Sequence, residues 1–255
     1  MLRGRATASL LVGVVLLAAV AVAALAVRTV TRTDGLPETG YPWHTGIVAT
    51  TFWVGEVFDP EAADGSQQFS AYDANWMDSY GGCDGVVTAA GDCETEPRTA
   101  ENGYFPRAMD PRENPFYLDL PFDDVNDHIA FQERGEVVPW ADEASYAAVV
   151  DDRSHSLMKN RWVALHRNGR VCYGQIEDAG PGEYADAAYV FGRNDERPAN
   201  ERFNGAGLDV SPALNGCLGF DELDGDGDRV DWAFVDEADV PDGPWMKIVT
   251  TSGVR

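Results

Sequence analysis

The sequence predicts a mainly β protein, either a small barrel or a sandwich, with little helix. The first observation is a series of short segments rich in β-branched and aromatic residues. The second is that clusters of Gly, Pro, Asn and Asp separate these segments. Many short strands with frequent turn signals are typical of closed or two-layered β folds. The length of 255 residues fits one domain, or one domain with a small insertion.

Eight segments have the composition of strands. They are residues 46–54, 116–122, 161–167, 170–177, 187–191, 206–210, 229–235 and 245–251. Pro121 ends the second of them, because proline cannot donate to a sheet hydrogen bond. Asn168-Gly169, between the third and the fourth, is the strongest two-residue hairpin signal and predicts that these two strands pair.

One short helix has a clear start signal. Ser211 is a favourable N-cap, and Pro212 is tolerated at the first helical position. We therefore expect a helix over 212–218 that ends near Gly219. A second short helix is expected over 142–150.

The N-terminus carries an export signal. Arg3 and Arg5 precede an uncharged apolar run at Ala8 to Val27, close to the roughly 20 residues that cross a bilayer as a helix. Either this run is an uncleaved membrane anchor, or it is a secretory signal with Ala24-Leu25-Ala26 as the cleavage triplet. Both interpretations place the remaining chain outside the cytoplasm, either tethered to the cell membrane or secreted.

Composition divides the chain into three parts. Residues 1–33 form the anchor or signal segment, residues 34–45 have the composition of a linker, and residues 46–255 form the β domain. Within that domain, residues from about 55 to 115 show no sustained periodicity, which predicts an insertion. Long irregular segments are uncommon unless functional, so the insertion is a candidate for shaping a substrate groove.

Four cysteines follow the apolar run, and an even number in an exported chain indicates disulfides. Four cysteines allow three connectivities, and we favour Cys83–Cys93 together with Cys172–Cys217. Free buried cysteines are the alternative. No Cys-x-x-Cys spacing is present, so a structural zinc site has little support.

The formal net charge of −24 disfavours several classes of partner. A strongly acidic surface repels phosphate backbones and anionic lipid headgroups, so we expect no nucleic-acid partner and no membrane contact beyond the N-terminal helix. Asp224, Asp226 and Asp228 have the spacing that opens a calcium loop, but Arg229 stands where glycine is required. A solvated turn is the preferred interpretation. The sequence predicts no metal, no cofactor and a monomer.

Two motifs resemble those of a known family. Asp178-Ala179-Gly180-Pro181 ends a predicted strand, and Leu208-Asp209-Val210-Ser211 opens the predicted helix. Together with the Asn168-Gly169 hairpin, they resemble the six-stranded double-psi β-barrel of rare-lipoprotein-A-like proteins and expansins. The resemblance covers about half the chain. It departs from the family pattern at Glu177, where Asn is usual, and at Ala179, where Arg or Lys is usual.

The resemblance implies a cell-envelope protein with cell-wall polysaccharide, such as peptidoglycan, as its partner. Some members of the family cleave glycan strands as lytic transglycosylases, whereas expansin-like members bind wall polymers without hydrolysing them. We expect one of these two activities. A third interpretation is a structural exoprotein whose insertion contacts a protein partner.

Asp209 is the candidate general acid. It lies between apolar Leu208 and Val210, where partial desolvation would raise the pKa of its carboxyl group. Asp178 is the candidate assisting carboxylate, with Glu177 behind it. The alternative is structural: Asp209 would accept backbone N–H groups near the helix start, and Asp178 would form an Asx-type turn.

Aromatic residues are candidates for stacking on sugar rings. Trp76 and Trp140 fall in predicted loop regions and are the candidate groove residues, together with Ser211. The tryptophans on predicted strands, Trp53, Trp162 and Trp232, are expected to pack in the core.

Overall fold

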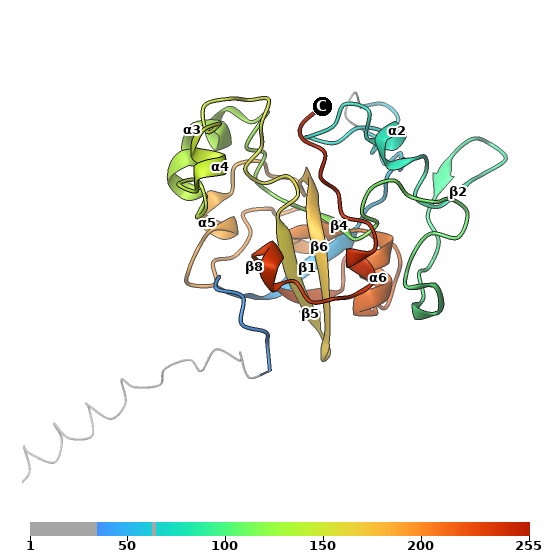
Figure 1. Cartoon of the computed structure of the whole chain (residues 1–255). Coiled ribbons are helices and arrows are strands. Elements are labelled where there is room, and N and C mark those ends of the chain that lie inside the picture. The colour runs from blue at the N-terminus through green and yellow to red at the C-terminus, as the bar shows by residue number, and fades with distance from the viewer. Residues whose placement is uncertain (1–34, 63–64) are drawn as a thin grey trace, which may run out of the picture. The chain divides into compact units, whose positions relative to one another are not determined.

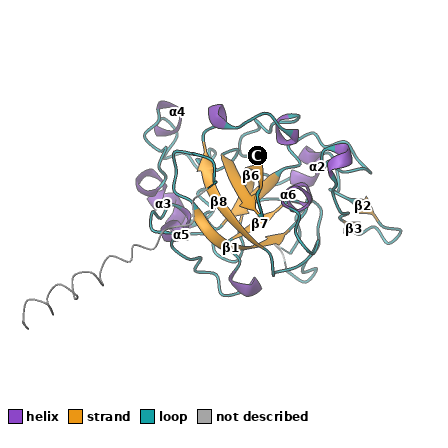
Figure 2. Cartoon of the chain, turned by 90° about the horizontal axis from the view of Figure 1, so that it is seen from below, coloured by secondary structure: helices purple, strands orange, loops and turns teal. Residues whose placement is uncertain are grey.

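The computed structural model describes residues 35–62 and 65–255, and residues 37–255 form one compact unit. A closed barrel of six strands lies at the centre of this unit (Figure 1). The short helices surround the strands when the unit is seen from below (Figure 2). The predicted anchor or signal helix lies outside the described residues. Within the described ranges, no helix combines the length and the apolar character needed to cross a bilayer.

Each barrel strand falls on a predicted strand segment. The strands are β1 (His44–Thr51), β4 (Tyr117–Leu120), β5 (Trp162–Arg167), β6 (Arg170–Ala179), β7 (Leu208–Val210) and β8 (Arg229–Val235). Their order around the barrel is β1-β7-β4-β6-β5-β8. The pairs β1–β7 and β4–β6 are parallel, and the other four pairs are antiparallel. The mainly β prediction is therefore confirmed, as a barrel and not a sandwich.

The β5–β6 hairpin turns at the two residues that predicted it. Asn168 has φ of 51° and Gly169 has φ of 81°. Two consecutive positive φ values match the type I′ turn, whose twist suits antiparallel strands, and Asn-Gly adopts it readily. The hairpin then pairs Arg167 with Arg170 and continues in register to Trp162 opposite Gln175.

Two of the eight predicted strands are wrong. Residues 187–190 form a short helix, α5 (Ala187–Val190), because the carboxylate of Asp186 accepts the backbone N–H of Tyr189 and caps the turn. The predicted strand at 245–251 is a 3-10 turn, η4 (Pro244–Met246), followed by an irregular segment. Since β8 pairs with both β1 and β5, the barrel is closed and offers no edge to a further strand.

The predicted helix over 212–218 is confirmed as α6 (Pro212–Leu218). The Ser211 hydroxyl accepts the N–H of Leu214 at 3.2 Å, as an N-cap does. The expected helix over 142–150 is shorter, α4 (Ala144–Ala147). A ten-residue helix, α3 (His128–Val137), was not expected, because its apolar residues form no stripe; the Asp127 carboxylate caps it through Ile129 and Ala130.

The insertion over about 55–115 packs beside the barrel. It contains α2 (Trp76–Tyr80), a hairpin of β2 (Val86–Val87) and β3 (Cys93–Glu94), and the 3-10 turn η1 (Ala100–Asn102). The hairpin projects from the molecule near α2, on the side of the barrel away from α3 and α4 (Figure 1). Asp84 and Arg98 form a fully buried ion pair of 2.7 Å at its base.

Both favoured disulfides are present. Cys83–Cys93 closes the base of the β2–β3 hairpin, and Cys172–Cys217 joins β6 to α6. None of the four cysteines is free. These bonds are consistent with an oxidising compartment.

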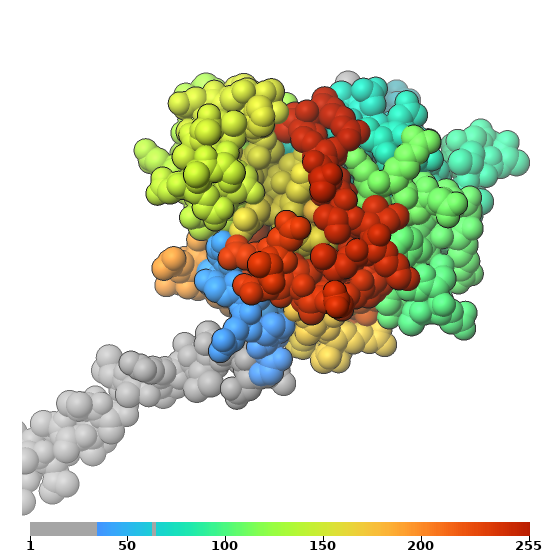
Figure 3. Space-filling view, in the orientation of Figure 1, coloured from blue at the N-terminus to red at the C-terminus, as the bar shows by residue number. Residues whose placement is uncertain are grey.

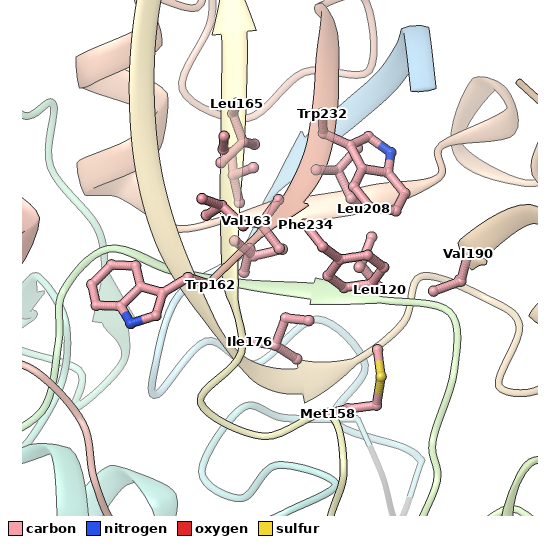
Figure 4. Close-up of a cluster of buried hydrophobic side chains, with 14 of the residues drawn as sticks. Leu120, Met158, Trp162, Val163, Leu165, Ile176, Val190, Leu208, Trp232 and Phe234 are labelled. Carbon is pink, nitrogen blue, oxygen red and sulfur yellow. The ribbon is translucent and has the colours of Figure 1, made fainter. Parts of the chain in front are cut away.

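The barrel is filled by large apolar side chains. Leu120, Leu165, Leu208, Trp232 and Phe234 come from four different strands and lie together in the interior (Figure 4). A second apolar cluster fills the space between β1, β4 and the insertion; its members are Phe52, Val54, Trp76, Tyr80 and Tyr117. The insertion therefore has its own packed contact with the barrel.

Candidate functional site

Three aspartates and a threonine form one row across four neighbouring strands. Asp119 of β4 pairs with Asp178 of parallel β6, and Asp209 of β7 pairs with Thr50 of parallel β1. Leu118 lies opposite Val210 in the antiparallel β4–β7 pair, which places Asp119 beside Asp209. Cross-strand neighbours on one face of a sheet are close enough to interact directly. The row therefore runs Asp178, Asp119, Asp209, Thr50.

Strand alternation turns this row away from the barrel interior. Leu118 and Leu120 flank Asp119, and both are buried in the apolar core. Leu208 and Val210 flank Asp209 in the same way. Successive side chains of a strand point to opposite faces, so the two aspartates point to the outer face of the barrel wall.

Asp209 is the most exposed residue of the three aspartates. The Thr50 hydroxyl donates a hydrogen bond to its Oδ1, and the residue keeps part of its surface exposed. Burial of the carboxyl raises its pKa to about 6, although the Thr50 hydrogen bond acts in the opposite direction. A carboxyl group with this pKa exchanges protons near neutral pH, as a general acid requires.

Asp119 lies between Asp178 and Asp209, the two aspartates that the sequence analysis identified. The sequence analysis did not identify Asp119 as a site residue. Its Oδ1 accepts the backbone N–H of Asp209 at 2.7 Å, and only 3% of the residue is exposed. Burial, together with the neighbouring charges of Asp209 and Asp178, raises the pKa of Asp119 well above the ordinary value. Asp119 therefore keeps its proton to a higher pH than an isolated aspartate does.

Asp178 is anchored at the other end of the row. Its Oδ1 accepts the N–H of Ala71 at 2.7 Å and that of Ala179 at 2.8 Å. Burial raises the pKa of Asp178 to about 7, against the lowering effect of these two N–H groups. Ala71 belongs to the insertion, so this hydrogen bond joins the insertion to the site.

A groove of about 720 Å³ opens beside Asp178. Phe58 and several insertion residues between 66 and 74 line it, together with residues of the loops before α3 and after β6. Val254 and Arg255 also line it, and in Figure 3 the last residues (red) lie between the segment around 125–158 and the segment around 65–80. The insertion thus supplies a wall of the groove.

A second cavity, of about 370 Å³, lies at the Thr50 end of the row. Thr50, Phe203 and the acidic turn at 222–226 line it. Nearby, burial raises the pKa of Glu56 to about 8, and the charges of Asp224 and Asp209 add to this effect. Glu222, Asp224 and Asp226 are exposed, in agreement with the solvated turn that the sequence predicts, and they also line this cavity.

Glu177 does not join the row. The β4–β6 register shifts between Leu118 and Asp119 and leaves Glu177 without a partner on β4. Its carboxylate is buried and accepts a 2.6 Å hydrogen bond from Lys159 Nζ. Burial raises its pKa to about 7, and the Lys159 charge opposes that shift. The contacts of Glu177 are those of a structural ion pair.

The three residues predicted to contact a substrate, Trp76, Trp140 and Ser211, are buried and have structural roles. Trp76 and Trp140 are each only 1% exposed, so neither ring can stack on a ligand. The Trp140 indole N–H donates to the carbonyl of Leu157 at 2.7 Å. Ser211 is fully buried as the N-cap of α6. Loop position alone was a poor guide to exposure, because the loops around both tryptophans pack against the barrel.

A repeated pattern in the sequence could have identified Asp119. Leu118-Asp119-Leu120 and Leu208-Asp209-Val210 both place an aspartate between two apolar residues of a predicted strand. An acidic residue at the centre of such a strand is unusual unless the structure uses it. What the sequence could not supply is the strand order that brings the two segments together.

Across residues 35–62 and 65–255, no group of three or more His, Cys, Asp or Glu side chains is arranged to hold a metal ion. A scan against protein-family models found no match to this chain, and neither did searches of curated proteins and of solved structures.

Proposed function

We propose that this chain is an exported cell-envelope protein that cleaves the glycan strands of peptidoglycan in the manner of a lytic transglycosylase. The observation that carries the proposal is the row of Asp178, Asp119 and Asp209, whose Asp178 end lines a groove. Glycosidic bond cleavage needs a carboxylic acid that delivers a proton and a negative group that stabilises the positive charge developing on the sugar. Burial raises the pKa of Asp209 to about 6 and that of Asp178 to about 7, so both carboxyl groups exchange protons near neutral pH.

The reaction balances with the groups in the row. Protonated Asp209 gives its proton to the bridging oxygen, and the bond from that oxygen to the sugar C1 breaks. The C6 hydroxyl of the same sugar then attacks C1 and returns its proton to the Asp209 carboxylate. The product carries a 1,6-anhydro end, and no water is consumed. Asp178 would assist as the second carboxyl group of the row, while Asp119 holds the Asp209 backbone in place by accepting its N–H.

The barrel supports the finer fold assignment within this proposal. We infer a double-psi barrel, in which β1–β7 and β4–β6 form the parallel pairs. The two motifs that resemble rare-lipoprotein-A-like proteins lie at the end of β6 and across β7 and the start of α6. They therefore supply Asp178 and Asp209 to the same row.

A non-catalytic wall-binding protein, similar in action to expansins, is the second candidate. One observation favours it: both Oδ1 hydrogen bonds of Asp178 go to backbone N–H groups, as in a structural role. In that case the row would shape a binding surface, and no bond would be cleaved.

The test is incubation of the full chain with purified peptidoglycan, followed by mass spectrometry of the released fragments. We expect fragments with anhydro-sugar ends, and Asp209→Asn should lower their release by at least about 100-fold because the proton donor is lost. The matched control is Asp142→Asn, which removes the same charge from an exposed position outside the site.

Full activity in Asp209→Asn would overturn the assignment of the acid. Absence of fragments, with co-sedimentation of the chain and the wall polymer, would support the binding protein instead. Circular dichroism of each variant separates loss of function from loss of fold.

A further inference from the structure

Four aromatic side chains are strongly exposed among the described residues: Phe58 at 57%, Phe69 at 36%, Tyr184 at 47% and Phe203 at 53%. Exposed aromatic rings are normally scattered over a protein surface. Here Phe58, Phe69 and Tyr184 all line the groove beside Asp178, and Phe203 lines the second cavity. All four rings therefore belong to the two hollows at the ends of the carboxylate row.

The two hollows lie on opposite sides of the row. The groove includes Asp178 of β6, and the second cavity includes Thr50 of β1. Between them lie β4 and β7, which carry Asp119 and Asp209. Three steps between neighbouring strands span roughly 14 Å, since each step is about 4.8 Å. A ligand that reaches both hollows must be longer than one sugar ring. Of the two described aspartates that lie between the hollows, Asp119 is only 3% exposed and Asp209 keeps part of its surface exposed.

The backbone at Phe203 is held in an unusual conformation. Phe203 has φ of 51° and Asn204 has φ of 57°, in the left-handed region that bulky residues rarely adopt. The Asn204 amide donates to the carbonyl of Asp226 at 2.9 Å, which ties this turn to the acidic turn across the cavity. The tertiary structure thus maintains a strained turn whose ring remains half exposed. Such strain is concentrated at functional sites.

Polar groups accompany the rings in the groove. Ser70, Gln67 and Asn126 line it together with Phe69 and Tyr184. Ligand sites combine aromatic surface with a few placed hydrogen-bonding groups. A pyranose ring matches this combination, because its C–H face packs on an aromatic ring while its hydroxyl and amide groups form hydrogen bonds.

The charges around the two hollows select against anionic ligands. Asp123 and Asp178 line the groove, and Glu222, Asp224 and Asp226 line the second cavity. Among the described residues, Arg255 is the one cationic residue that lines either hollow, and its guanidinium lies 3.6 Å from Asp73 and 3.7 Å from Glu113. The Arg202 guanidinium lies 5.5 Å from the centre of the Phe203 ring and leaves the acidic side chains of the second cavity in excess. Like charges along a cleft repel a polyanion before it makes contact.

We propose that the four rings form two platforms, Phe58, Phe69 and Tyr184 on one side and Phe203 on the other, that hold one uncharged glycan strand across the carboxylate row. The strand is engaged at an internal position, with sugars bound on both sides of Asp209. This inference rests on the proposed function for its choice of a glycan as the ligand. It adds the path of the strand, the binding residues and a preference for stretches of the strand that carry no free carboxylate.

The test measures binding in the Asp209→Asn chain, so that the ligand is not consumed. Isothermal titration calorimetry would compare N-acetylglucosamine oligomers of two, four and six units. We expect the hexamer to bind at least about tenfold more tightly than the dimer, because only the hexamer reaches both platforms. Phe69→Ala and Phe203→Ala, introduced separately, should each remove most of that advantage. An oligogalacturonate of the same length should bind at least tenfold more weakly.

The matched control is Val87→Ala, which removes an equally exposed apolar side chain from the β2–β3 hairpin, outside both hollows. It should bind the hexamer as the parent does. The proposal is overturned if no oligomer binds, if length has no effect, if both aromatic variants keep parental affinity, or if the galacturonate binds equally well.

The outcomes for this inference and for the proposed function are separable. Length-dependent binding that the aromatic variants lose, without any cleavage by the unmutated chain, would uphold the platforms and overturn catalysis. Cleavage of peptidoglycan by a chain whose aromatic variants bind normally would uphold catalysis and overturn the platforms.

Discussion

Asp119 lies between two other carboxyl groups, and its environment links stability to pH. Its pKa and those of Asp178 and Asp209 are all raised in the folded protein, chiefly by burial. Above the ordinary aspartate pKa of about 4, the folded chain therefore binds more protons at these groups than the unfolded chain does. Their contribution to stability is greatest at low pH and is lost as the pH rises through about 6 to 7.

Replacement of Asp119 tests whether these carboxyl groups lower the stability of the protein as the pH rises. Asp119→Asn keeps an oxygen that can accept the Asp209 N–H but removes the titrating group. We expect the free energy of unfolding to rise by about 1–3 kcal/mol at pH 8 and to change little at pH 4, as measured by urea denaturation. Asp142→Asn, at an exposed site, is the control. An equal change at both pH values would show that repulsion among the carboxyl groups is not the cause.

Among the elements, α6 connects the site to the barrel. Ser211 caps α6 directly after β7, and Cys217 near its end is bonded to Cys172 of β6. The disulfide spans 45 residues of sequence, which include both Asp178 and Asp209. It therefore restricts the unfolded chain in the segment that supplies two of the three carboxyl groups.

The two disulfides should differ in their effect on stability. A chain-entropy model gives about 4 kcal/mol for the Cys172–Cys217 loop and about 3 kcal/mol for the ten-residue Cys83–Cys93 loop. Cys172→Ala/Cys217→Ala should thus lower the free energy of unfolding more than Cys83→Ala/Cys93→Ala does. Chemical denaturation of both double variants measures the difference. A larger loss from the shorter loop would indicate that packing of the insertion dominates.

At the scale of the whole molecule, excess negative charge opposes folding. The chain has 43 acidic and 19 basic residues, and its net charge is −24. Like charges are closer together in the folded state than in the unfolded chain, so their repulsion destabilises the compact form. Salt screens such repulsion, with a Debye length of about 10 Å at 0.1 M and about 3 Å at 1 M.

Sodium chloride should therefore stabilise the protein. We expect the thermal unfolding midpoint to rise by several degrees between about 0.02 and 0.5 M salt at pH 8, as measured by circular dichroism. At pH 4, where many carboxyl groups are neutral, the rise should be smaller. A fall in the midpoint with salt at pH 8 would mean that attractive ion pairs, such as the buried Asp84–Arg98 pair, outweigh the net repulsion.

The sequence alone was sufficient to predict the turns, helix starts and strands that depend on a few adjacent residues. Asn168-Gly169 specified the β5–β6 turn, Ser211-Pro212 specified the start of α6, and the strand compositions located all six barrel strands. These features require only a few adjacent residues, so a single sequence contains them. The helix at 187–190 was mistaken for a strand because one capping carboxylate, Asp186, outweighed the composition.

The contacts between residues that are distant in the sequence could be identified from the tertiary structure and not from the sequence. Asp119 and Asp209 are 90 residues apart and become neighbours because β4 pairs with β7, a choice made by barrel closure and not by either strand. Burial of Trp76 and Trp140 and exposure of Phe69 and Phe203 likewise depend on how distant segments pack. The pairing of distant strands depends on contacts summed over the whole barrel. The individual strands could therefore be predicted from the sequence, whereas the row of carboxyl groups is formed by the order of the strands in the folded barrel.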